Sequence, residues 1–316
     1  MKALKPKIAI IGAGNVGATF AFSLMMSGLA REIVLIDKNE LLARGECMDL
    51  NHSLSFVHPA RIYQAGFEGC EDADIVVIAA GSNRKPGQSR TDLVSINVEI
   101  YKEIVPAILK YTSEAILLVV TNPVDILTWV TLKVSGLPVS RVLGSGTVLD
   151  TARLKYMISD YCKVDPANIH AYIIGEHGET ELAVWSNATI AGMAVETYCS
   201  VYAHLNNPKK ELAGIFEKVR NSAHLIIEAK GATNYSIALA LLKITRSIVR
   251  GENSILPVST MVSDYYGVSD VCMGVPAYVS KNGVEHFLKI SLSKPEQVQF
   301  KHSADALKEI IASINL

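Results

Sequence analysis

The chain has 316 residues, of which 49% are hydrophobic and 19% are charged. A chain of this length and composition buries a large core without disulfide or metal staples, which excludes an intrinsically disordered protein. The 30 basic and 31 acidic residues leave a formal net charge of -1, which excludes a global attraction to nucleic acid or to an anionic membrane.

The cysteines and the apolar runs further limit which kind of protein this chain is. The 5 cysteines are Cys47, Cys70, Cys162, Cys199 and Cys272, and no two stand at C-x-x-C spacing. We therefore predict reduced, buried thiols in a cytoplasmic protein, with no disulfide framework and no metal site. The apolar runs, such as residues 75–80, are too short to cross a bilayer, and the N-terminal run breaks into glycines instead of forming a signal peptide.

Short apolar runs alternate with helical patterns through the first half of the chain. The runs are residues 8–11, 32–36, 75–80 and 115–120, and the helical patterns are residues 18–27 and 93–111. Strands that are apolar throughout and alternate with helices are typical of a parallel sheet covered on both faces. The first half is therefore predicted to be a doubly wound α/β sheet.

The second half has longer helical patterns and fewer strands. Helices are predicted at residues 149–162, 211–230, 232–250 and 303–314, a short strand at 171–174, and β-like segments within 272–292. Asn282-Gly283 between those β-like segments is a strong hairpin signal. No flexible linker separates the halves, so we expect them to pack tightly with a cleft between them.

A glycine-rich turn follows the first predicted strand. Gly12, Gly14 and Gly17 form a G-x-G-x-x-G run that opens a helix, the context in which such a run binds a dinucleotide pyrophosphate at a helix N-terminus. Asp37 ends the second strand, where a carboxylate accepts hydrogen bonds from a ribose diol and repels a 2′-phosphate. The spacing therefore predicts NAD, in preference to NADP, as the cofactor.

Polar side chains cluster where apolar elements end. Asn122 follows the strand at 115–120, and His177 follows the strand at 171–174. Asp150 and Arg153 are three residues apart on a helix and so share a face. Each has an ordinary structural interpretation, such as a core histidine or a solvated ion pair, and it is their joint occurrence after a cofactor turn that points to catalysis.

Four segments carry a resemblance that runs essentially end to end. They are TNPVDILT (121–128), GSGTVLDTAR (144–153), IGEHGETE (174–181) and KGAT (230–233), and they resemble the L-lactate dehydrogenases of the lactate/malate dehydrogenase superfamily. The resemblance implies a Rossmann NAD-binding domain in residues 1–146, a mixed α+β substrate domain in residues 147–316, and a homotetramer, with a dimer left open.

The resemblance also implies roles for the catalytic positions. His177 would exchange a proton with the substrate oxygen, and Asp150 would orient its imidazole and raise its pKa. Arg153 would hold the substrate carboxylate through two hydrogen bonds, while Arg90 would close over the substrate and polarise its carbonyl. The remaining implied substrate contacts are Arg84, Asn122 and Thr233. The implied cofactor contacts are Gly12, Gly14, Val16, Gly17, Asp37, Gly81, Ser82, Val120, Asn122 and Ser145.

Arg84 departs from the lactate pattern. Typical lactate dehydrogenases carry Gln at this position, whereas malate dehydrogenases carry Arg opposite the second carboxylate of their substrate. An Arg closed against the methyl group of pyruvate would be an unpaired buried charge, which argues for oxaloacetate. Thr233 and the GSGTVLD segment match the lactate pattern instead. We predict L-lactate dehydrogenase activity, with malate dehydrogenase or dual use as the alternative.

A second departure concerns regulation. Some bacterial lactate dehydrogenases bind fructose 1,6-bisphosphate through an Arg and a His, and here Lys155 replaces the Arg while His170 matches the His. A lysine binds phosphate as a point charge without the guanidinium fork, so activation by the bisphosphate stays open. Two other classes also stay open, an NAD protein without net redox chemistry and a cofactor-binding regulator without turnover.

Overall fold

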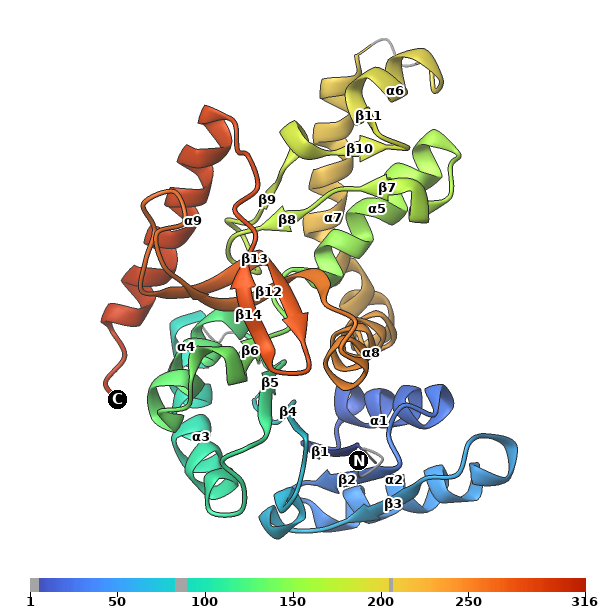
Figure 1. Cartoon of the computed structure of the whole chain (residues 1–316), viewed down its shortest axis with the longest axis vertical. Helices are drawn as coiled ribbons and strands as arrows, with labels where there is room; N and C mark the ends of the chain where they lie inside the picture. The colour runs from blue at the N-terminus through green and yellow to red at the C-terminus, as the bar shows by residue number, and fades with distance from the viewer. Residues whose placement is uncertain (1–5, 83–89, 205–206) are drawn as a thin grey trace.

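The computed structural model describes residues 6–82, 90–204 and 207–316, without the side chains of residues 90 and 91. Its centre is a 9-stranded sheet with the order β14-β13-β12-β6-β5-β4-β1-β2-β3 (Figure 1). Six of these strands are parallel: β1 (Lys7–Ile11), β2 (Glu32–Ile36), β3 (Arg61–Gln64), β4 (Ile75–Ile78), β5 (Ile116–Val119) and β6 (Val142–Gly144). The order 3-2-1-4-5-6 is that of the Rossmann fold, and it reverses between β1 and β4.

Helices cover both faces of this sheet because its strands bury both rows of side chains. Ile8 and Ile10 of β1 join one core cluster, whereas Ala9 and Ile11 join the other. The first cluster lies beneath α1 (Asn15–Ser27) and α2 (Glu40–His52), and the second beneath α3 (Arg90–Leu109) and α4 (Val124–Ser135). Both faces of the sheet are therefore buried beneath helices, which confirms the doubly wound prediction.

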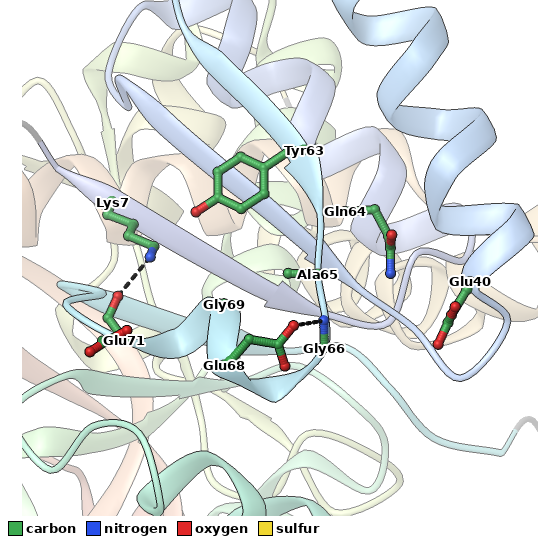
Figure 2. Close-up of a pocket in the computed structure, with 9 residues that line it drawn as sticks. All are labelled: Lys7, Glu40, Tyr63, Gln64, Ala65, Gly66, Glu68, Gly69 and Glu71. Carbon is green, nitrogen blue, oxygen red and sulfur yellow. Dashed lines mark hydrogen bonds between the residues drawn. The ribbon is translucent and has the colours of Figure 1, made fainter.

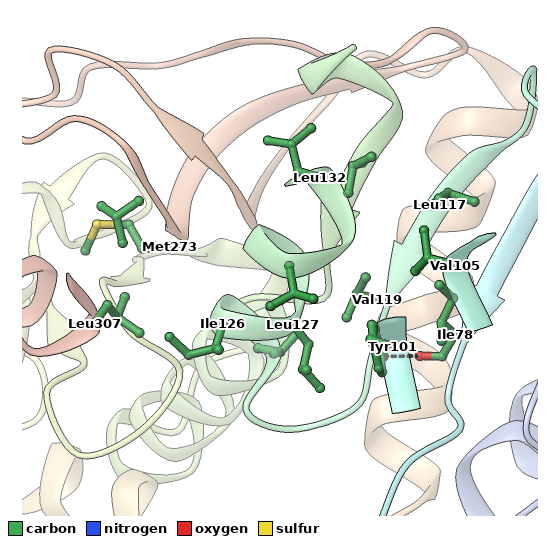
Figure 3. Packing of buried hydrophobic residues seen from close by; sticks show 14 of the residues in the cluster. Ile78, Tyr101, Val105, Leu117, Val119, Ile126, Leu127, Leu132, Met273 and Leu307 are labelled. Carbon is green, nitrogen blue, oxygen red and sulfur yellow. Dashed lines mark hydrogen bonds between the residues drawn. The ribbon is translucent and has the colours of Figure 1, made fainter. Parts of the chain in front are cut away.

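The sheet continues into the second half of the chain. β12 (Ser254–Val262) pairs antiparallel with β6 through Ser259 and Gly144, and it is followed by β13 (Val271–Ser280) and β14 (Gly283–Phe287). α8 (Tyr235–Arg250) joins the α1 face, and α9 (Lys294–Ala312) joins the α4 face. Figure 3 shows Met273 and Leu307 in one cluster with Leu127 and Val119, so the halves share a core.

A smaller α+β lobe carries the rest of the second half. It contains α5 (Val148–Cys162), α6 (Val195–Val201) and α7 (Pro208–Lys230), with a third apolar cluster among them. Its short strands are β7 (Ile169–His170), β8 (Ile173–Ile174), β9 (Leu182–Ala183), β10 (Thr189–Ile190) and β11 (Met193–Ala194). None of the helices in the described ranges is long and apolar enough to span a membrane.

Most predicted ends differ from the structure by up to three residues, and two predicted elements differ over a larger part of their length. The predicted strand 171–174 is only Ile173–Ile174, since β9 pairs with those two residues alone and the Ile173 N–H donates to Thr151 Oγ1. The predicted helix at 303–314 begins at Lys294, since Ser293 and Glu296 form a capping box there. The hairpin at Asn282-Gly283 is confirmed, with Gly283 at φ 90°.

Candidate active site

The glycine turn lies at the carboxyl end of β1, where the strand order reverses. Gly12 has φ 103°, and a Cβ on it would lie 2.7 Å from the Ala80 nitrogen. A Cβ on Gly17 would lie 1.9 Å from the Gly12 oxygen, so helix α1 packs directly on the turn. Only glycine fits either position, as expected of a turn that lets a helix N-terminus approach a pyrophosphate.

The first turn of α1 is open toward a ligand. Gly14 is its N-cap, and among the described residues no side chain caps it and no atom outside the adjoining backbone lies within 4 Å of where a Cβ would stand. Asp37, directly after β2, accepts the Ala13 N–H at 2.7 Å and the Asn39 N–H at 2.8 Å, which fixes its carboxylate beside the turn. Free helix N–H groups next to a carboxylate fit a pyrophosphate with a neighbouring ribose diol, so these residues suit a dinucleotide without a 2′-phosphate.

A buried asparagine that sequence reasoning missed links two other predicted positions. Asn97 of α3 accepts the Ser82 N–H at 2.7 Å and donates to the Asn122 carbonyl at 2.8 Å. It thereby joins the ends of β4 and β5, next to Gly81. In the sequence, the only sign of Asn97 is a polar residue among the apolar positions of this helix. Val120 and Ser145 are buried at the ends of β5 and β6, and Val16 is half-buried in α1.

The predicted catalytic groups meet at the start of α5. The Asp150 carboxylate contacts His177 Nδ1 at 2.6 Å through Oδ2, and accepts a hydrogen bond from Arg153 Nη1 at 3.0 Å through Oδ1. Asp150 is 4% exposed, whereas the His177 side chain is 25% exposed. One buried carboxylate therefore orients two cations, and His177 keeps an accessible edge.

A second carboxylate holds the backbone of His177. Asp125, at the start of α4, accepts the His177 N–H at 2.7 Å and the Ser259 hydroxyl at 2.6 Å. Asp125 is 2% exposed, and burial raises its pKa to about 6, against the opposing effect of those two hydrogen bonds. Sequence reasoning missed this residue, although an aspartate in the apolar run 124–132 is a visible signal.

The electrostatics of the cluster favour a protonated imidazole. Burial alone would lower the pKa of His177, but the carboxylates of Asp150, Glu181 and Asp125 raise it to about 9. Burial would raise the pKa of Asp150, yet His177 and Arg153 hold it below its ordinary value. Burial and the nearby Asp150 charge raise the pKa of Glu181 to about 8. A histidine in this setting carries a proton at neutral pH.

Asp150, His177 and Glu181 also have the geometry of a small metal-ligand set. Their ligand atoms all lie within 4.8 Å of one another. However, both carboxylate oxygens of Asp150 already bind cationic partners, and Arg153 would repel a further cation. The arrangement suits proton transfer and the binding of an anion better than it suits a metal ion.

Several predicted residues are not brought into this cluster by any described contact. Arg84 lies outside the described residues, and of Arg90 the structure describes only the backbone, at the first residue of α3. Thr233 is half-buried between α7 and α8. Lys155 is partly buried on α5, and His170 is exposed on β7. Their roles stay predictions.

A hollow elsewhere on the first half has a different character. Its lining includes Lys7, Tyr63, Gly66, Glu68 and Glu71, where Lys7 Nζ donates to the Glu71 carbonyl at 2.6 Å (Figure 2). None of the residues that line it belongs to the predicted site. Two of its charged groups bond to backbone, Lys7 to the Glu71 carbonyl and Glu68 to the Gly66 N–H, and the hollow contains no predicted catalytic residue, so it does not compete as the catalytic centre.

Known proteins resemble the whole chain. Residues 6–144 match the model of the lactate/malate dehydrogenase NAD binding domain, and residues 147–315 match that of the alpha/beta C-terminal domain. An L-lactate dehydrogenase of Acetivibrio thermocellus is 51% identical over 98% of both chains, and one of Priestia megaterium is 49% identical over 96% and 95%. The ligand-bound minor L-lactate dehydrogenase of Enterococcus mundtii superposes with a TM-score of 0.95 at 38% identity, covering 99% of each chain.

Proposed function

The chain belongs to the lactate/malate dehydrogenase family, and we propose that it interconverts pyruvate and L-lactate with NAD, using His177 as the general acid and base. The observation that carries this proposal is the Asp150 carboxylate, which is bonded at once to the His177 ring and to the Arg153 guanidinium. That arrangement places a proton donor beside a carboxylate-binding group, as a 2-oxo acid requires.

The proton moves at the free nitrogen of His177. Because Nδ1 is bonded to Asp150, it keeps its hydrogen, and Nε2 is the atom that exchanges a proton with the substrate. In reduction, protonated His177 donates from Nε2 to the carbonyl oxygen of pyruvate, and in oxidation the neutral ring accepts the hydroxyl proton of L-lactate. NADH, when bound, supplies the hydride for the carbonyl carbon.

The other groups bind and orient. Arg153 commits Nη1 to Asp150, and its remaining guanidinium N–H groups are proposed to hold the substrate carboxylate. We assign Arg90 to closing over the substrate and Asn122 to the substrate oxygen and the nicotinamide. The glycine turn with Asp37, and the strand ends at Gly81, Ser82, Val120 and Ser145, are proposed to hold the cofactor in residues 1–146, and residues 147–316 the substrate.

The relatives favour pyruvate over oxaloacetate, since those at 51% and 49% identity are L-lactate dehydrogenases. The test compares kcat/KM for the two 2-oxo acids at fixed NADH, with and without fructose 1,6-bisphosphate. A ratio of tenfold or more in favour of oxaloacetate would refute the pyruvate assignment. Arg84→Gln, compared with the wild-type chain, then reports whether Arg84 reads a second carboxylate.

We also propose a homotetramer that works in the cytoplasm. The support for assembly is a set of large apolar side chains exposed on the neighbouring helices α1 and α8. They are Phe22 at 48%, Met26 at 51%, Tyr235 at 69% and Leu239 at 60% exposure. Apolar groups gathered in this way are typical of surfaces covered by another subunit. Light scattering of the purified protein tests the assembly, and a monomer would refute it.

A further inference from the structure

Two cysteines meet in the small lobe, away from the catalytic cluster. Cys162 is the last residue of α5 and Cys199 lies in α6, and their sulfur atoms are 3.1 Å apart. Cys199 is fully buried and Cys162 is 9% exposed, both within the apolar cluster of this lobe. Two thiols held in contact inside a core are already arranged as a potential disulfide.

The pair differs from the other cysteines of the chain. Cys47, Cys70 and Cys272 are also free and buried, but no second thiol lies within hydrogen-bond reach of any of them. Burial raises the pKa of Cys47 to about 11 and that of Cys70 to about 12, which makes both thiols unreactive. By contrast, the hydrogen bond between the Cys162 and Cys199 thiols lowers the pKa of Cys162. Cys162 is therefore the thiol that ionises most readily.

We propose that Cys162 and Cys199 form a site of reversible oxidative modification, at which hydrogen peroxide converts the two thiols into a disulfide. The Cys162 thiolate attacks one peroxide oxygen, an S–O bond forms and the O–O bond breaks, so that Cys162 becomes a sulfenic acid. The hydroxide that leaves takes up the proton that Cys162 lost on ionising, which gives water. The Cys199 sulfur then attacks the Cys162 sulfur, the S–S bond forms, and the S–O bond of the sulfenic acid breaks. The departing hydroxyl takes the Cys199 proton and leaves as a second water. Two thiols lose two electrons, and the peroxide gains them.

The geometry favours this outcome over further oxidation. The resolving sulfur of Cys199 already lies at 3.1 Å, so the sulfenic acid meets a thiol before it meets a second peroxide. The two sulfur atoms need to approach by only about 1 Å from their 3.1 Å separation to reach the S–S bond length of about 2 Å. The new bond would tie the end of α5 to α6, about 18 Å along the helix from Asp150.

The experiment treats the full chain with hydrogen peroxide, alkylates it under denaturing conditions, and maps the cysteine peptides by mass spectrometry. We expect one linked peptide pair, Cys162 with Cys199, lighter by two hydrogen atoms and restored by dithiothreitol. Cys47, Cys70 and Cys272 should remain alkylated. Any of four results would overturn the proposal. They are five alkylated thiols after treatment, a different cysteine pairing, a disulfide between two chains, and sulfinic acid at Cys162 without a disulfide.

Two variants test the order of events. In Cys199→Ser the sulfenic acid has no thiol to react with, so dimedone should label Cys162, whereas the wild-type chain should give little label. Cys47→Ser is the matched control, and it should form the disulfide as the wild-type chain does. Equal dimedone labelling of Cys162 in the wild-type chain and in Cys199→Ser would contradict the role of Cys199. Neither variant touches the catalytic cluster, so untreated activity should be unchanged.

Discussion

Replacing Asp150 with asparagine tests the negative charge with which this carboxylate faces both His177 and Arg153. The amide keeps the size of the side chain, but it loses the charge that faces His177 Nδ1 at 2.6 Å and Arg153 Nη1 at 3.0 Å. Among the groups that raise the pKa of His177, Asp150 contributes most. Its removal should therefore return that pKa from about 9 toward the ordinary value of 6.5.

The size of the effect follows from that shift. A change of about 2.5 pKa units corresponds to about 3 kcal/mol, or about two orders of magnitude in an equilibrium constant. At pH 7 the ratio of protonated to neutral His177 would fall from about 100:1 to about 1:3. Because the proposed reduction of pyruvate needs the protonated ring, the protonated fraction sets the rate, and that fraction falls from nearly all to about a quarter. At pH 7 kcat/KM for pyruvate should therefore fall by about fourfold from the loss of protonation alone, with further loss where the imidazole is misoriented.

The assay is the pH dependence of kcat/KM for pyruvate, which should lose its basic limb near pH 9 and gain one near pH 6.5. Asp160→Asn is the matched control, because Asp160 lies on the same helix, is 67% exposed and pairs only with Lys163 in the described structure. If Asp150→Asn keeps its limb near pH 9, or loses less than about threefold in kcat/KM, the electrostatic reasoning is wrong.

Four further outcomes follow from the same contacts. Glu181→Gln removes a carboxyl that raises the pKa of His177, so the basic limb should move toward lower pH, and an unmoved limb would speak against the coupling. Asp125→Asn leaves one of two donors without an acceptor, which should cost about 1–3 kcal/mol in urea unfolding. Because the folded pKa of His177 lies above 6.5, protonation of His177 stabilises the fold fully below pH 6.5. Up to about 3 kcal/mol of this stability is lost as the pH rises to about 9, and equal urea midpoints at pH 6.5 and pH 9 would contradict this. Gly17→Ala should destabilise the protein, whereas Gly45→Ala, in an open helical position, should stabilise it by about 0.5–1 kcal/mol.

The sequence predicts strands well where apolar runs stand alone. β2 has the predicted bounds, and β1, β4 and β5 differ by a residue or two. A short apolar run between turns predicts a buried strand in such a fold. Helix α4 was missed because most of its residues are buried, so its apolar residues show no clear helical period and cannot be told from a strand by periodicity. Strand β12 was missed because Pro257 argues against a strand with two neighbours.

The site is predictable only where local spacing determines it. The three-residue spacing of Asp150 and Arg153 predicts their shared face, and the ion pair confirms it. The contact of His177 with Asp150 spans 27 residues and entered only through family resemblance. The contacts of Asp125 with His177 and Ser259 span 52 and 134 residues, and no local pattern encodes such pairs.

The Asp125 contacts have a consequence for chimaeras that combine halves of two related chains. The backbone of His177, the proposed general acid, is bound by Asp125 from the other half of the molecule, and Asp125 also accepts the hydroxyl of Ser259 in the strand that extends the shared sheet. A chimaera that joined the first half of one relative to the second half of another would have to inherit both partners of this contact together. An exchange between relatives must therefore keep the Asp125 contacts matched across the two halves, in addition to the apolar core that the halves share.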